Sequence, residues 1–361
     1  YVTVFDEWTE VTVPVAELGY SNLYNASIQF QFATWNNGEV EYVLLDQVYM
    51  TLKADEELVV PTQIPNYEKY RGEKKLDVLA FWMPPIEDIH YQWMQEAGIT
   101  ALVIDNQYGA VEGAPLVKAL SLCDKYGIDA YIMISREQAN ALYPSNYPYV
   151  TDHPSLKGFY VDEPLNEEQM NDIAAMVKAA EPMGLTVIVN KMPWTDADSN
   201  RWFDTAFADC GDNLIVCATN YPLLTDGIRS DWLEINGLTA ESAATVSAPH
   251  WQFVATTGYG DRRQITESDI RWQYYAALAY GAKGIGDFSY CTPSYGGEWN
   301  DPQHAPIWWT DIDDTSTYYR ADTYYYLQAV NQEISKFDHV LLSFDWQGVM
   351  KSAGSEASTT A

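Results

Sequence analysis

From Leu76 onward, short apolar runs rich in β-branched residues alternate with longer segments whose apolar residues recur at helical spacing. The short runs are typical of parallel strands buried on both faces, and the longer segments predict amphipathic helices. The predicted strands are Leu76 to Phe81, Ala101 to Asp105, Ala130 to Ser135, Gly158 to Asp162, Thr186 to Asn190, Asn213 to Ala218, Trp251 to Ala255 and Gly284 to Phe288. The helical segments include Glu87 to Ala97, Ala114 to Tyr126, Glu167 to Ala180 and Ser268 to Tyr280.

This repeated strand-helix unit predicts an α/β fold, the (β/α)8 TIM barrel, over residues 75–346. The predicted helices are followed by glycines, which permit a left-handed cap, at Gly98, Gly127, Gly184 and Gly281. A doubly wound open sheet is the alternative. We disfavour it because the first strand is followed by Trp82-Met83-Pro84-Pro85 and not by a GxGxxG turn.

The N-terminal residues 1–55 have a different pattern, in which apolar and polar positions alternate, as at Val11, Val13 and Val15. Alternation with period two predicts antiparallel strands, and about four strands make part of a β-sandwich. Residues 56–74, with Pro61 and Pro65, are predicted to be a linker, and so is the Ser/Ala/Thr-rich stretch 347–361. We therefore expect further modules of the same polypeptide upstream and downstream.

Charge and hydropathy exclude several classes of partner. The chain has 20 Lys and Arg against 51 Asp and Glu, a net charge of -31, which would repel a nucleic acid backbone. No apolar run approaches the ~20 residues needed for membrane insertion, and residues 1–30 show no basic start followed by an apolar stretch. The acidic, aromatic-rich and lysine-poor composition favours a secreted or cell-surface protein that meets neutral polymers.

The cysteines do not indicate a metal site or a disulfide framework. They lie at Cys123, Cys210, Cys217 and Cys291, without a CxxC pair and without a histidine at ligand spacing. We predict buried free thiols, no metal and no cofactor. A metal-dependent barrel hydrolase is disfavoured for the same reason, because no histidine pair follows the strands.

In a TIM barrel the chemistry lies where the strands end, so the residues after each strand are the candidate site. Three carboxylates stand at such positions: Asp162, Glu163 and Asp287. The candidates for substrate contacts are Trp82, Asp105, Asn106, Asn190, Asn220, Tyr221, Tyr259, Tyr290 and Trp299, the last in a long aromatic loop. Aromatic rings together with amide and carboxylate groups suit a sugar, whose apolar faces pack on rings.

Structural explanations compete with each of these assignments. Asp162 and Glu163 also fit an acidic start of the helix beginning near Glu167, and Asp287 fits a buried hydrogen-bonding group. Asp105 and Asn106 are equally compatible with a solvated loop, and each aromatic residue with core or rim packing. Asp269 follows Thr266 at capping-box spacing, so we assign it to helix capping.

Three segments resemble known families. Glu39 to Val48 resembles the last strands of jelly-roll carbohydrate-binding modules. His153 to Pro164, which contains Gly158-Phe159-Tyr160-Val161-Asp162-Glu163, resembles the fourth barrel strand of many bacterial glycoside hydrolases. Arg271 to Ile285 resembles the seventh helix and eighth strand of bacterial glycosidases distantly similar to clan A. The resemblance implies a bacterial TIM-barrel glycoside hydrolase with a carbohydrate substrate and with Glu163 as general acid/base.

Two positions depart from the clan A pattern. Asp162 stands where an Asn usually precedes the acid/base, and Trp251 to Gly260 contains no carboxylate where clan A carries its nucleophile. A retaining enzyme would then use Asp287 as the second carboxylate. The alternative is a dyad similar to that of substrate-assisted hexosaminidases, in which Asp162 orients a 2-acetamido group, Glu163 protonates the leaving oxygen and Tyr221 holds the acetamido carbonyl.

Strand geometry bears on this dyad. Neighbouring strand residues point to opposite sides, which would separate Asp162 from Glu163, but Pro164 interrupts the strand and leaves both arrangements open. A further alternative, from a different class, is a non-catalytic glycan-binding surface protein on a decayed barrel. The missing carboxylate after the seventh strand motivates it.

Overall fold

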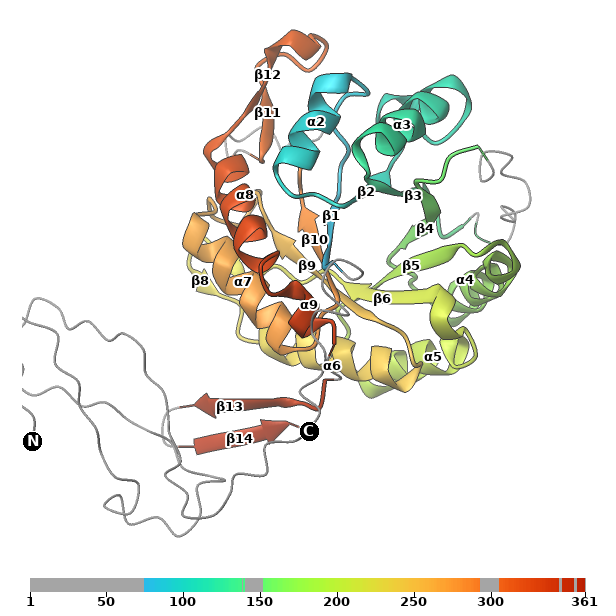
Figure 1. The fold of residues 1–361 in the computed structure, drawn as a ribbon. Helices are drawn as coiled ribbons and strands as arrows, with labels where there is room; N and C mark the ends of the chain where they lie inside the picture. Colours follow the sequence, from blue (N-terminus) through green and yellow to red (C-terminus); the bar gives the residue numbers. More distant parts are fainter. Residues whose placement is uncertain are drawn as a thin grey trace, which may run out of the picture. The chain divides into compact units, whose positions relative to one another are not determined.

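The computed structural model describes residues 75–137, 139, 152–292, 305–343, 346–353 and 356–360. Parallel strands close into a barrel in the order β1, β10, β9, β6, β5, β4, β3, β2, and helices surround it (Figure 1). The barrel strands are β1 (Asp77–Ala80), β2 (Ala101–Ile104), β3 (Asp129–Ile134), β4 (Leu156–Asp162), β5 (Thr186–Lys191), β6 (Leu214–Ala218), β9 (His250–Ala255) and β10 (Gly284–Phe288). The predicted TIM barrel is confirmed, with a strand at each predicted position.

The helices that follow the barrel strands bury many of their apolar residues. They are α2 (Asp88–Glu96), α3 (Gly113–Tyr126), α4 (Glu167–Ala180), α5 (Ala197–Phe207), α6 (Trp232–Thr245), α7 (Glu267–Ala279), α8 (Asp322–Ile334) and α9 (Asp338–Leu341). Gly127 caps α3 in the left-handed conformation, with φ 67° and ψ 41°, as its position predicted. None of the helices in the described residues is long and apolar enough to span a bilayer.

The interior of the barrel is filled by aromatic rings under its carboxyl-terminal mouth. The ring of Phe81 lies 5.3 Å from that of Tyr160 and 5.7 Å from that of Phe253. Gly286 on β10 makes room for them, because a Cβ there would lie 2.7 Å from ring atoms of Phe253. This layer closes the barrel, so any ligand must bind above it.

Within the described ranges, three pairs of short antiparallel strands lie outside the barrel: β7 (Leu223–Leu224) with β8 (Gly227–Ile228), β11 (Ile307–Trp309) with β12 (Tyr318–Arg320), and β13 (Val349–Ala353) with β14 (Glu356–Thr360). The last pair lies within 347–361, the stretch predicted to be a linker. Val349, Thr359 and Thr360 are β-branched, and such residues favour extended pairing. The expected β-sandwich 1–55 and linker 56–74 lie outside the described residues.

Other predictions about the core are also tested. Cys123, Cys210, Cys217 and Cys291 are buried free thiols, as predicted. Tyr324 is also fully buried, in α8.

Candidate active site

A cavity of about 380 Å³ lies at the carboxyl ends of the barrel strands, within the size range of small-molecule sites. One side is polar and is formed by residues at the ends of β4, β5 and β6 or directly after them. The other side is aromatic and is formed by residues of β1, β9 and β10 and the loops that follow them. The lining residues are Phe81, Trp82, Met133, Tyr160, Asp162, Glu163, Asn190, Thr219, Tyr221, Phe253, Tyr259 and Phe288.

Asp162 ends β4 and is held by two hydrogen bonds to one of its oxygens. Oδ1 accepts from the hydroxyl of Tyr160 at 2.9 Å and from Nδ2 of Asn190 at 2.6 Å. Tyr160 lies two residues earlier on the same strand, so its side chain points to the same side as Asp162. Asn190 is fully buried on β5, in register with Asp162. Both donors come from regular strands, so the carboxylate is fixed in the cavity.

Glu163 follows directly, and its main chain has a left-handed φ of 43°. A non-glycine residue in this conformation costs about 1–3 kcal/mol and persists only where its surroundings hold it. Its amide donates to the carbonyl oxygen of Asn190 at 2.9 Å, and its own carbonyl oxygen accepts from Nη1 of Arg136 at 2.7 Å. An extended residue would point away from Asp162. The left-handed turn instead brings both carboxyl groups to the same cavity.

The carboxyl group of Glu163 is half-buried, and its Oε1 accepts a hydrogen bond from Thr219 at 2.8 Å. Burial raises the pKa of Glu163, and the neighbouring charge of Asp162 raises it further. The bond from Thr219 and the charge of Arg136 act in the opposite direction. The balance is a raised pKa, which keeps the carboxyl protonated to higher pH and suits a proton donor.

Tyr221 contributes a buried hydroxyl that has no hydrogen-bond partner in the part of the chain that the structure describes. Its ring stacks on Phe288, with centroids 4.9 Å apart and planes at 23°, and Trp82 lies 5.0 Å from Phe288 on the same wall. An unpaired hydroxyl in a ligand-sized cavity is a donor that a bound ligand can use. The rings beside it offer flat faces on which a sugar ring can pack.

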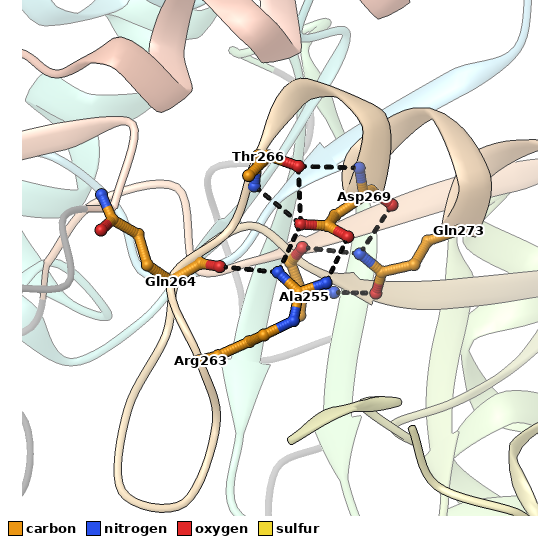
Figure 2. A network of polar contacts seen from close by, with 6 residues as sticks. All are labelled: Ala255, Arg263, Gln264, Thr266, Asp269 and Gln273. Carbon is orange, nitrogen blue, oxygen red and sulfur yellow. Dashed lines mark hydrogen bonds and ion pairs between the residues drawn. The ribbon is translucent and has the colours of Figure 1, made fainter. Parts of the chain in front are cut away.

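The loop between β9 and α7 carries Tyr259 and is tied to both elements (Figure 2). Thr266 and Asp269 form the capping box of α7, which confirms the predicted capping role of Asp269. Arg263 binds both oxygens of Asp269, at 2.7 and 2.6 Å. The side chain of Gln273 bonds the main-chain N–H and C=O of Ala255 at the end of β9. These contacts anchor both ends of the loop.

Asp287 lies on β10 but is not among the residues that line the cavity. It is fully buried, and its Oδ1 accepts a hydrogen bond from the hydroxyl of Tyr274 on α7 at 2.9 Å. Burial raises the pKa of Asp287 to about 8. The structure thus places this carboxyl between the barrel and a helix, away from Asp162 and Glu163.

Some of the predicted substrate contacts line the cavity and others do not. Trp82, Asn190, Tyr221 and Tyr259 line the cavity, whereas Asp105, Asn106, Asn220 and Tyr290 do not. Asp105 is buried and accepts hydrogen bonds from the amides of Met83 and Gln107 and from the side chain of Gln107. Asn106 is exposed, Tyr290 is fully buried, and Asn220 is buried with its Nδ2 3.5 Å from the carbonyl oxygen of Trp232. Trp299 lies outside the described residues.

Half of the lining residues were not predicted from the sequence: Phe81, Met133, Tyr160, Thr219, Phe253 and Phe288. Most of them are inward-facing residues within or at the end of a strand, and the strand periodicity could have identified them. Tyr160, for instance, must share a side with Asp162. Thr219 had no signal beyond its place next to Asn220. No three His, Cys, Asp or Glu side chains come together as a metal site anywhere in the described ranges.

No protein-family model and no curated protein sequence matches this chain. Solved structures do. The GH99 endo-alpha-mannosidase from Bacteroides thetaiotaomicron has 16% identity and a TM-score of 0.45, covering 69% of this chain and 78% of its own. The GH5_18 protein from Bifidobacterium longum, solved with Manb1-4GlcNAc, has 12% identity and a TM-score of 0.50, covering 72% and 78%. An HpcH/HpaI aldolase from Desulfitobacterium hafniense has 12% identity and a TM-score of 0.40, covering 62% and 89%. At these identities the likeness is one of fold.

Proposed function

We propose that the protein is a glycoside hydrolase in which Glu163 gives its proton to the departing sugar oxygen. The observation that carries the proposal is the joint entry of Asp162 and Glu163 into one aromatic-walled cavity. The raised pKa of Glu163 keeps a proton available for transfer, and the rings of Trp82 and Phe288 give a sugar an apolar surface.

Glycoside hydrolysis commonly needs a second group on the other side of the bond that breaks, unless the substrate supplies it. Asp162 and Glu163 are the carboxylates among the described lining residues, and they are neighbours on one wall. We therefore assign the second role to a 2-acetamido group of the substrate. Asp162 accepts the hydrogen bond of the acetamido N–H, and Tyr221 donates to the acetamido oxygen.

The reaction then proceeds in two steps. In the first, the acetamido oxygen bonds to the anomeric carbon while the bond from that carbon to the leaving oxygen breaks, and the leaving oxygen takes the proton of Glu163. Asp162 stabilises the positive charge that forms on the cyclised acetamido group. In the second step, Glu163 accepts a proton from water while the water oxygen attacks the anomeric carbon. The bond between that carbon and the acetamido oxygen breaks, which opens the ring formed in the first step and restores the acetamido group. Two displacements at one carbon give net retention.

Matched pairs of aryl glycosides with weakly acidic phenol leaving groups, with and without the 2-acetamido group, test this proposal. The wild-type protein should hydrolyse the acetamido member with retained configuration, followed by NMR of the released sugar. Glu163→Gln should lower kcat by at least about 10²-fold. Glu167→Gln is the matched control, because Glu167 is exposed at the start of α4 and should leave turnover unchanged.

Each alternative predicts a different result. Equal hydrolysis of both members of a pair would remove the acetamido group from the mechanism. Wild-type turnover by Glu163→Gln would remove Glu163 as the proton donor. Glycan binding without any released sugar would favour the non-catalytic, glycan-binding alternative. We also propose action outside the cell, which the acidic and aromatic-rich composition supports.

A further inference from the structure

The unfavourable main-chain conformation of Glu163 raises the question of what holds it. Its amide bond to Asn190 continues the pairing of β4 with β5, which an extended residue would also make. Its carbonyl group is different, because the φ of 43° turns it out of the strand direction. The carbonyl oxygen of Glu163 instead accepts a hydrogen bond from a side chain of another segment.

That side chain is Arg136, which follows β3, the strand next to β4. Nη1 donates to the carbonyl oxygen of Glu163 at 2.7 Å, while Nε donates to Oε1 of Glu137 at 2.9 Å. A guanidinium group is planar and presents its donors in a fixed fork, so Arg136 can bond to Glu137 and to Glu163 at the same time. The side chain is 29% exposed, so the contact lies at the edge of the barrel mouth.

We infer that Arg136 is a positioning residue for the acid: it stabilises the left-handed turn at residue 163 and thereby directs the Glu163 carboxyl into the cavity. The inference rests on the proposed function for its kinetic consequence but not for its structural one. Arg136 is not among the residues that line the cavity, so it acts through Glu163 and not on the substrate.

If the bond from Arg136 is lost, the side-chain contact that remains to Glu163 is the hydrogen bond from Thr219 to its carboxyl group. An extended residue 163 would point to the outer side of the strand, by the alternation that governs β4. Asp162, Tyr221 and the aromatic wall do not depend on Arg136. Removal of Arg136 should therefore lower kcat and leave KM nearly unchanged.

Three variants test the inference. Arg136→Ala should lower kcat by about 10²-fold, the cost of a small misplacement of a catalytic group, with KM and melting temperature close to wild type. Added guanidinium, well below denaturing concentrations, should restore part of the loss. Arg136→Lys should also recover part of it, since an ammonium still supplies a donor. Glu137→Gln is the matched control, because it removes the ion pair and keeps the bond to Glu163.

A crystal structure of Arg136→Ala decides the structural claim without any activity measurement. We expect residue 163 to have a negative φ and its carboxyl to leave the cavity. A positive φ with the carboxyl still in place would overturn the inference, as would wild-type kcat in Arg136→Ala or an equal loss in Glu137→Gln. Failure of the hydrolase proposal itself would appear separately, as no turnover by the wild-type protein.

Discussion

The hydroxyl of Thr219, after β6, donates to Oε1 of Glu163, after β4, at 2.8 Å. This bond occupies one of the two carboxyl oxygens. We therefore expect the acidic proton of Glu163 on Oε2. The pair also explains how a loop threonine, which contributes no charge, affects the acidity of the proposed proton donor: a hydrogen bond to a carboxylate stabilises its ionised form.

Thr219→Val keeps the shape of the side chain and removes its hydroxyl. Because the bond from Thr219 lowers the pKa of Glu163, its loss should raise that pKa. Glu163 works in its protonated form, so the alkaline limb of the kcat/KM profile should move to higher pH, and kcat should fall by about tenfold. Thr219→Ser keeps the hydroxyl and should behave as wild type. An unshifted alkaline limb in the valine variant would show that this bond does not tune the acid.

Tyr160→Phe removes one of the two hydrogen bonds that hold Asp162. A hydrogen bond to a charged group contributes about 1.5–3 kcal/mol, so kcat/KM on acetamido glycosides should fall by about 10- to 100-fold. Tyr131→Phe is the control, since Tyr131 lies deeper in the barrel against Trp251. An equal change of kcat/KM in the two variants would mean that the hydrogen bond from Tyr160 to Asp162 does not contribute to turnover.

Asp287→Asn tests the structural role of the buried carboxyl. Its folded-state pKa of about 8 lies above its ordinary value of 3.8, so the folded protein binds the proton more tightly than the unfolded chain. Its contribution to stability is present at low pH and is lost between these two values, at up to about 1.4 kcal/mol per pH unit. Asparagine stays neutral and still accepts from Tyr274.

The asparagine variant should therefore unfold at a higher temperature than wild type at pH 8, with the two proteins closer at pH 5, as measured by calorimetry. Because Asp287 does not line the cavity, turnover should be unchanged. A loss of turnover of about 10² or more would instead make Asp287 the second carboxylate of the reaction.

Gly286→Ala tests the packing beneath the cavity. The added Cβ would lie 2.7 Å from the ring of Phe253, which must then move towards the cavity that it lines. Overpacking of this kind costs about 1–3 kcal/mol, so the melting temperature should fall and KM should rise. Gly237→Ala in α6 is the control, because its Cβ would meet Tyr280 at an ordinary 3.4 Å. Wild-type KM in Gly286→Ala would indicate that Phe253 gives way in another direction.

The sequence was sufficient for the barrel because the strands are buried, largely apolar runs and most of them are followed by a polar residue. It also placed Glu163 and Tyr221 at the mouth, because the residues after parallel strands meet there. It could not decide whether Asp162 and Glu163 face the same side. That depends on the φ angle of Glu163. The side chains of Arg136 and Thr219 contact Glu163 in this conformation, and they lie 27 and 56 residues away in the chain.

A position directly after a strand did not predict correctly which of the other candidates line the cavity. Asp105 follows β2, yet its oxygens pair with main-chain amides that would otherwise be unsatisfied. Tyr290 follows β10 but is fully buried. Whether such a residue faces the mouth or the core is set by the path of its loop, and composition does not encode that path.

If Glu163 delivers a proton to the leaving oxygen, the effect of replacing Glu163 must depend on the acidity of the leaving group. We would measure kcat/KM, which covers the steps up to departure of the leaving group, for wild type and Glu163→Gln on aryl glycosides of graded leaving-group acidity. We expect kcat/KM to fall by about 10² or more for poor leaving groups and to change little for activated phenols, which depart without protonation. The same loss for every leaving group, or no loss at all, would show that Glu163 is not the proton donor.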